Sequence, residues 1–122
     1  MNNFEELEAW KQARALRNDI AALVKKFPSE EKYKLTDQLL RSTRSVTANI
    51  AEGYGRFHYQ ENIQFCRQAR GSLTETLDHL ICASDSSYID EKLLSDYRSK
   101  ISQNIKVLNG YILYLKKRKE EL

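Results

Sequence analysis

Apolar side chains recur along this chain at intervals of three and four residues, which is the spacing of one face of an α-helix. No stretch keeps the alternation of a β-strand for long, and the whole sequence contains one proline and four glycines. Proteins built from strands and turns need more of these turn-forming residues. The pattern therefore predicts an all-α protein.

Four amphipathic helices are expected. The first spans about residues 4–26 and ends there because Pro28 disfavours helical backbone in the residue before it. The second, capped at Thr36 or a neighbour, ends in a glycine-containing stretch, and the third runs from about residue 58 to residue 84. Asp90 is a good N-cap for the fourth.

Each helix has one inward-facing stripe. The four stripes are Leu7, Trp10, Ala13, Leu16, Ile20, Leu23 and Phe27; Leu39, Thr43, Val46 and Ile50; Ile63, Cys66, Leu73, Leu77, Leu80 and Ile81; and Leu94, Tyr97, Ile101, Ile105, Leu108, Ile112 and Leu115. Long helices with short links predict an antiparallel up-down-up-down four-helix bundle, with one domain over residues 1–122.

Some apolar surface is left over after this core is filled. The surplus consists of a second stripe on the fourth helix and of aromatic residues at the start of the third and before it: Val107, Tyr111, Tyr114, Phe65, Tyr54, Phe57 and Tyr59. One alternative is that tyrosines lie harmlessly at the surface. We favour contact with a second copy of the chain, because a lone bundle needs one stripe per helix. The interface candidates are Phe57, Tyr59, Phe65, Tyr111 and Tyr114.

The stretch NIAEGYGR, with two glycines one residue apart, is the first candidate site. A nucleotide-binding glycine loop follows a strand and opens a helix, whereas these glycines follow a helix, which favours a structural role. Gly53 suits the left-handed position after a helix, and Gly55 allows close passage to the third helix. We expect Asn49 to hydrogen-bond across the bundle and Glu52 to pair with Arg56.

The stretch ARGSLTE is the second candidate. Gly71 lies in mid-helix, where glycine costs about 1 kcal/mol relative to alanine. Together with Ser72, it predicts a close helix–helix contact. Arg70 and Glu75 are expected to reach the end of the bundle that holds NIAEGYGR and to form a polar cluster there. Such clusters more often specify a fold than perform catalysis, and an enzyme would need open space around this one.

Neither a metal nor a cofactor is expected. Di-iron bundles need paired Glu-x-x-His motifs, and the only histidines, His58 and His79, do not provide them. Cys66 and Cys82 are sixteen positions apart on one predicted helix, about 24 Å, which is too far for a disulfide. No small-molecule substrate is expected either.

Location and charge narrow the partners. No apolar run approaches the roughly 20 residues of a membrane span, and the acidic beginning lacks the features of a signal peptide, so a cytoplasmic protein is expected. The 20 basic and 17 acidic residues give a net charge of +3, which permits a polyanionic partner. Candidate phosphate-binding ridges are Arg14, Arg17, Arg41, Arg44, Lys116, Lys117, Arg118 and Lys119. Ordinary solvated faces, and cations at a helix C-terminus, remain the alternative.

Several spaced motifs together carry a family resemblance. They are F-x-x-L-x-x-W at residues 4–10, L-x-x-Q-L-x-R-S at 35–42, S-V-x-x-N-I-A-E-G-Y-G-R at 45–56 and F-x-x-x-A-R-G-S-L-x-E at 65–75. On these motifs the chain resembles the bacterial four-helix-bundle family encoded in intervening sequences of 23S ribosomal RNA genes. It is also similar to the nucleic-acid-binding accessory protein of diversity-generating retroelements.

The resemblance implies a homopentamer associated with ribosomal RNA genes, without enzymatic activity. We therefore expect a non-enzymatic homo-oligomer that binds ribosomal RNA or another nucleic acid through its basic ridges. The alternative is a protein-interaction scaffold for a polymerase or ribosomal partner that does not bind nucleic acid itself.

Overall fold

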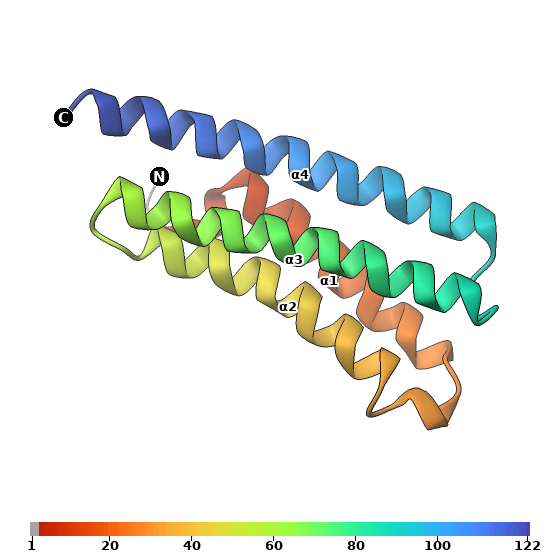
Figure 1. Ribbon diagram of the computed structural model, residues 1–122. Helices are drawn as coiled ribbons and strands as arrows, with labels where there is room; N and C mark the ends of the chain where they lie inside the picture. Colours follow the sequence, from red (N-terminus) through yellow and green to blue (C-terminus); the bar gives the residue numbers. More distant parts are fainter. Residues whose placement is uncertain (1–2) are drawn as a thin grey trace.

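Four α-helices, α1 (Glu8–Leu23), α2 (Leu35–Tyr54), α3 (Tyr59–Asp85) and α4 (Glu91–Glu120), make up most of the computed structural model, which describes residues 3–122. The helices run alternately up and down, and each packs against the next one in the chain, while α1 also packs against α4 (Figure 1). α2 and α4 therefore occupy opposite corners of the bundle. The predicted all-α up-down-up-down bundle is confirmed.

The first predicted helix is interrupted at both ends. A short 3-10 turn at Phe4–Glu6 precedes α1, and Val24–Lys26 forms another after it. Between the first turn and α1, Leu7 has extended backbone (φ −69°, ψ 126°). This break folds the Phe4 ring back against Trp10, with the ring centroids 5.2 Å apart in an edge-on arrangement. The contact between the two rings and the burial of Leu7 thus stabilise a break where the sequence predicted one continuous helix.

The start of α2 uses a different cap from the predicted one. The helix begins at Leu35 rather than after Thr36, and its first N–H donates to the Glu31 carboxylate at 3.3 Å. The Tyr88 hydroxyl donates to the same carboxylate at 2.7 Å. These two hydrogen bonds, that from Tyr88 first, lower the pKa of Glu31. At the start of α4, Asp90 caps the helix as predicted, accepting from the Leu93 N–H at 2.8 Å.

Most residues of the predicted inward stripes are buried in the core, but Trp10, Leu77, Ile81, Leu94 and Ile105 are only half-buried. In α4, Asn104 takes the inward position in place of Ile105, at 7% exposure. The helix turns its third residue after Ile101 toward the core, although the apolar side chain stands one position later. The Asn104 amide donates to the Lys100 carbonyl at 2.9 Å, and within residues 3–122 its buried Oδ1 has no hydrogen-bond partner.

Hydroxyl side chains join α2 to α3 inside the bundle. Thr76, which is fully buried, lies 2.8 Å from Ser42 (Oγ1 to Oγ), and Ser72 lies 2.9 Å from Ser45 (Oγ to Oγ). These side chains are small, so the two helices approach closely. Their hydrogen bonds to each other offset the cost of removing the hydroxyl groups from water. Pairing of this kind favours one register of α2 against α3.

Candidate functional site

The glycines of the two motifs have roles different from those predicted. α2 continues through Gly53, and none of the glycines within residues 3–122 has positive φ, so the predicted left-handed cap is wrong. A Cβ on Gly53 would lie 2.7 Å from Asn62 Oδ1 and 2.9 Å from Phe65 Cβ. The absence of a side chain at Gly53 therefore allows α3 to pack closely against α2. Gly55 meets only carbonyls of its own chain at 3.5 and 3.7 Å, and Gly71, predicted to allow close packing, faces open space.

Arg56 fastens the α2–α3 corner. Its guanidinium Nη2 lies 3.3 Å from Glu52 Oε1, as predicted, and Nη1 lies 3.7 Å from Glu61 Oε2. The same guanidinium lies over the Phe65 ring, 4.9 Å from its centroid. The Arg56 guanidinium thus connects the end of α2 to the first turns of α3. The prediction included only its pairing with Glu52.

The polar cluster predicted from the two motifs does not form. Arg70 donates to Asn109 of α4 (Nη1 to Oδ1, 2.7 Å), and Glu75 lies 3.0 Å from a histidine one turn later in α3. Asn49 donates to Ser45 in its own helix at 2.8 Å instead of across the bundle. These residues point in different directions because successive positions of a helix rotate by about 100°. Ser72 does make the predicted close contact with α2.

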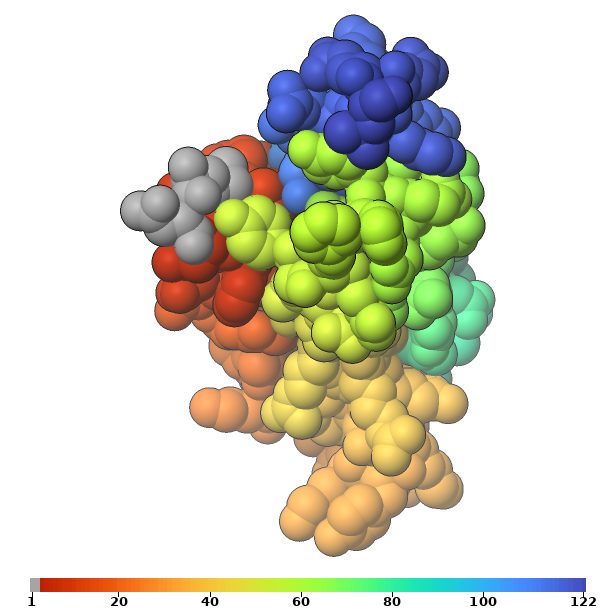
Figure 2. Space-filling model, turned by 90° about the vertical axis from the view of Figure 1, so that its left-hand side faces the viewer, coloured from red at the N-terminus to blue at the C-terminus, as the bar shows by residue number. Residues whose placement is uncertain are grey.

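The surplus aromatic residues other than Phe65 surround a cavity of about 600 Å³ at the end of the bundle where α1 begins and α4 ends. Figure 2 looks onto this end, where the start of α1, the α2–α3 corner and the end of α4 meet. We call this space the aromatic cavity; its ring-bearing lining residues are Tyr54, Phe57, His58, Tyr59, Tyr111 and Tyr114. Leu7, Ala9, Val107 and Leu115 add apolar surface.

Much of the predicted interface surface is therefore accounted for inside one chain. Tyr54, Tyr59 and Tyr111 pack against the core, whereas Phe57 is 93% exposed and Tyr114 is 55% exposed. Phe65, also predicted to lie at an interface, is half-buried beneath the Arg56 guanidinium.

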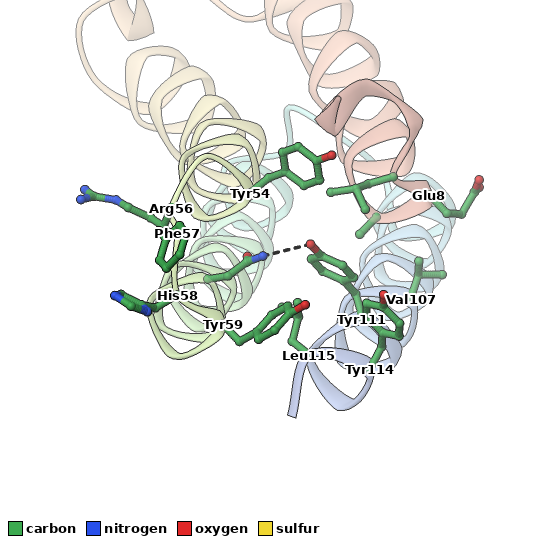
Figure 3. A pocket seen from close by; sticks show the side chains of 13 residues that line it. Glu8, Tyr54, Arg56, Phe57, His58, Tyr59, Val107, Tyr111, Tyr114 and Leu115 are labelled. Atoms are coloured by element: carbon green, nitrogen blue, oxygen red, sulfur yellow. Dashed lines mark hydrogen bonds between the residues drawn. The ribbon is translucent and has the colours of Figure 1, made fainter. Parts of the chain in front are cut away.

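A hydrogen bond crosses the aromatic cavity from α3 to α4. Asn62 donates from Nδ2 to the Tyr111 hydroxyl at 3.0 Å (Figure 3). Burial raises the pKa of Tyr111 to about 12, so its hydroxyl stays protonated at neutral pH. Tyr111 also stacks on Tyr114, with centroids 6.2 Å apart and planes inclined by 14°. The cavity is thus lined mainly by aromatic side chains and crossed by one hydrogen bond between neutral groups.

Possible metal ligands and thiols are the remaining candidates for a reactive site among the described residues. Across residues 3–122 no group of three His, Cys, Asp or Glu side chains is placed to hold a metal ion. Cys66 and Cys82 are both free thiols. Burial raises the pKa of Cys66 to about 12, which keeps it in the unreactive thiol form. None of the helices in this part of the chain combines the length and apolar composition needed to cross a bilayer.

The predicted basic residues separate into two groups on opposite sides of the bundle. The first borders the seam between α1 and α2, where Arg17 Nη1 lies 3.2 Å from Thr47 Oγ1, three residues beyond Arg44. Two members of this group are engaged within their own helices: Arg41 pairs with an aspartate at 3.1 Å, and Arg14 lies over a tryptophan ring at 5.5 Å.

The second group lies between α3 and α4. A groove of about 320 Å³ runs between these helices; its lining residues, which define the basic groove, are Gln60, Ile63, Arg67, Lys116, Lys119 and Glu120. Arg70 and its partner Asn109 lie further along the same two helices. Lys116 and Lys119 were predicted from the sequence as phosphate-binding residues, whereas Arg67 was not. Its position four residues after Ile63 and three before Arg70 was the available signal.

The remaining cations at the end of α4 take other directions. Arg118 pairs with Glu121 at 3.2 Å, and interaction with the Tyr59 hydroxyl at the aromatic cavity raises the pKa of Arg118. Lys117 is exposed. The four consecutive cations thus take different directions, two toward the basic groove, one toward Tyr59 and one into solvent, because neighbouring helical positions face different sides.

The fold and the two sites define an all-α four-helix-bundle protein that has a basic groove between α3 and α4 and an aromatic cavity at one end of the bundle. The chain belongs to the family of 23S rRNA-intervening sequence proteins, whose model matches residues 5–110. It is also similar in fold to the crystal structure of a protein of unknown function from the S23 ribosomal protein family of Bacteroides thetaiotaomicron. That match has a TM-score of 0.78 and 23% identity, and covers 85% of this chain and 94% of the other. No curated protein matches the chain significantly.

Proposed function

We propose that this protein is a non-enzymatic homo-oligomer that binds RNA through the basic groove. The observation that supports this most directly is the convergence of Arg67, Lys116 and Lys119 on one groove, with Arg70 beside it. Glu120 is the one acidic residue in the lining. Lysine and arginine that replace counterions along a phosphate backbone supply most of the affinity for nucleic acid.

The seam between α1 and α2 is the weaker candidate. Arg41 is paired with Asp37, and Arg17 is hydrogen-bonded to Thr47, so both must give up contacts before they bind phosphate. The basic groove gathers cations from two helices: Lys119 is hydrogen-bonded to Gln60, whereas Arg67 and Lys116 form no ion pair with the described residues. The family name points to ribosomal RNA as the first ligand to test.

Assembly is the second part of the proposal. The family resemblance implies five subunits, and exposed apolar side chains support self-association: Phe57 at 93%, Tyr114 at 55% and Leu113 at 54%. Apolar surface of this kind is typical of subunit contacts. In light scattering we expect a mass near five times 14.3 kDa. A mass of one subunit that persists at micromolar and higher concentrations would contradict the assembly.

The RNA proposal predicts a salt-dependent affinity that depends on the basic groove. We expect the double variant Arg67→Glu/Lys116→Glu to bind a duplex fragment of 23S rRNA at least tenfold more weakly at low salt. The slope of log affinity against log salt should also fall by about one to two, because each phosphate contact contributes about 0.7 to 0.9. Fluorescence anisotropy at several salt concentrations measures both quantities.

A matched variant controls for net charge. Arg14→Glu/Arg44→Glu makes the same change in charge on the opposite seam and is expected to reduce affinity by less than threefold. Equal losses for the two variants would show that the groove has no special role. Undetectable binding of RNA by the native protein at low salt would reject the proposed function and favour a protein-interaction scaffold.

A further inference from the structure

The aromatic cavity and the basic groove are neighbours, separated by the first turn of α3. Tyr59 lines the cavity, and Gln60, the next residue, lines the groove. The end of α4 lies beside both residues: Lys119 donates to Gln60 (Nζ to Oε1, 2.6 Å), and interaction with Tyr59 raises the pKa of Arg118. A strand that leaves the groove past this turn therefore reaches the mouth of the cavity.

We propose that the aromatic cavity binds an unpaired nucleobase of a single-stranded RNA whose phosphates lie along the basic groove. This inference rests on the proposed function and adds a second element of recognition to it. The groove would hold the sugar–phosphate backbone without regard to sequence. The cavity would select strands that have a base free to leave the stack.

The shape and chemistry of the cavity suit a base. Its volume of about 600 Å³ falls within the range of small-ligand sites, roughly 300–1,000 Å³. Proteins that bind unpaired bases stack them on aromatic side chains, and four tyrosines line this space. Figure 3 shows Tyr54, Tyr59 and Tyr111 directed toward its centre. The Tyr111 hydroxyl accepts from Asn62 and keeps its own proton to donate to a base edge.

Charge around the cavity favours a nucleotide over an apolar side chain as the occupant. Arg118 lies beside Tyr59 at the mouth, where it can contact the phosphate that accompanies an inserted base. Glu8, the acidic residue of the lining, points away from the centre in Figure 3. A second copy of the chain that inserted the exposed Phe57 would fill the cavity without a charged group to contact Arg118, and it is the occupant that the test must exclude.

The test compares single-stranded with duplex RNA in the full-length protein. The probes are a fluorescent single-stranded 12-nucleotide RNA, the same strand carrying abasic sites, and the duplex of equal length. For the native protein we expect the abasic strand to bind about tenfold more weakly than the intact strand, the loss of one base–aromatic stack. Tyr114→Ala, which changes a side chain that is already 55% exposed, should weaken binding of the intact strand by a similar factor. Val107→Trp, which fills the cavity, should do the same.

Controls separate this inference from the proposed function. Tyr33→Ala changes a tyrosine that is 83% exposed and remote from the cavity, and should leave affinity for all three probes unchanged. Duplex affinity and its salt slope should be the same in native protein and in Val107→Trp, because Val107 lines the cavity and is not one of the exposed residues assigned to assembly. Equal affinity of the native protein for intact and abasic strands would overturn the base site while leaving salt-dependent RNA binding intact. The base site would also be overturned if Tyr114→Ala or Val107→Trp dissociated the assembly in light scattering without weakening the binding of the single strand. That result would indicate that a second copy of the chain occupies the cavity.

Discussion

Replacing Gly53 by alanine is expected to reduce the free energy of unfolding by about 2 kcal/mol or more. The new Cβ would lie 2.9 Å from Phe65 Cβ, a backbone-attached atom that moves only if α3 moves, and 2.7 Å from Asn62 Oδ1. Overpacking a close contact costs roughly 1–3 kcal/mol. Displacing Asn62 would also break its hydrogen bond to Tyr111, for about 1 kcal/mol more. Urea denaturation followed by circular dichroism measures the change.

Two other glycines provide matched controls for this prediction. Gly71 in α3 and Gly110 in α4 have no atom within 4 Å of a Cβ position, and both are exposed. Alanine at either position should raise the free energy of unfolding by about 0.5–1 kcal/mol, because glycine is the poorer helix former. A stabilising effect of Gly53→Ala, alongside the same effect at Gly71, would mean that α2 and α3 are not in close contact at Gly53.

The helical stripes made the architecture predictable, whereas the detailed backbone conformation was not. Period and proline placement gave four helices and their order, since both are local properties of the chain. The left-handed role predicted for Gly53 failed because glycine has two uses, positive φ and close approach. Only the position of α3 decides between them. The burial of Asn104 was not predicted for a related reason. The inward stripe was assigned to apolar residues, whereas the direction of a side chain depends on its angular position around the helix.

The aromatic cavity and the basic groove depend on which helices become neighbours. The sequence alone therefore did not predict them. Surplus aromatic residues were visible in the sequence, but their convergence on one cavity requires the end of α4 to meet the α2–α3 corner. Likewise, Arg67 joins Lys116 only because α3 and α4 are antiparallel neighbours. The polar cluster failed because Arg70 faces α4 rather than α2. Side-chain direction around a helix, more than residue type, decided these outcomes.

Replacing Leu115 by alanine is expected to cost about 3 kcal/mol of stability. This side chain is 2% exposed on the inner face of α4 and also forms part of the aromatic cavity wall. Truncation of a buried leucine removes its transfer free energy and leaves a void, with losses of about 2–5 kcal/mol. Chemical denaturation at several protein concentrations is the appropriate measurement, because assembly would make the midpoint depend on concentration.

Leu113, two positions earlier in the same helix, is the matched control. Its side chain is 54% exposed in the single chain, so Leu113→Ala should cost less than about 1 kcal/mol within one subunit. The exposed face of α4 also carries Asn109 and Lys116, one turn to either side of Leu113, and therefore borders the basic groove. A loss equal to that of Leu115→Ala that grows on dilution would show that Leu113 is buried between subunits. The RNA-binding groove would then lie next to a subunit contact, and the number of grooves available to RNA would depend on assembly.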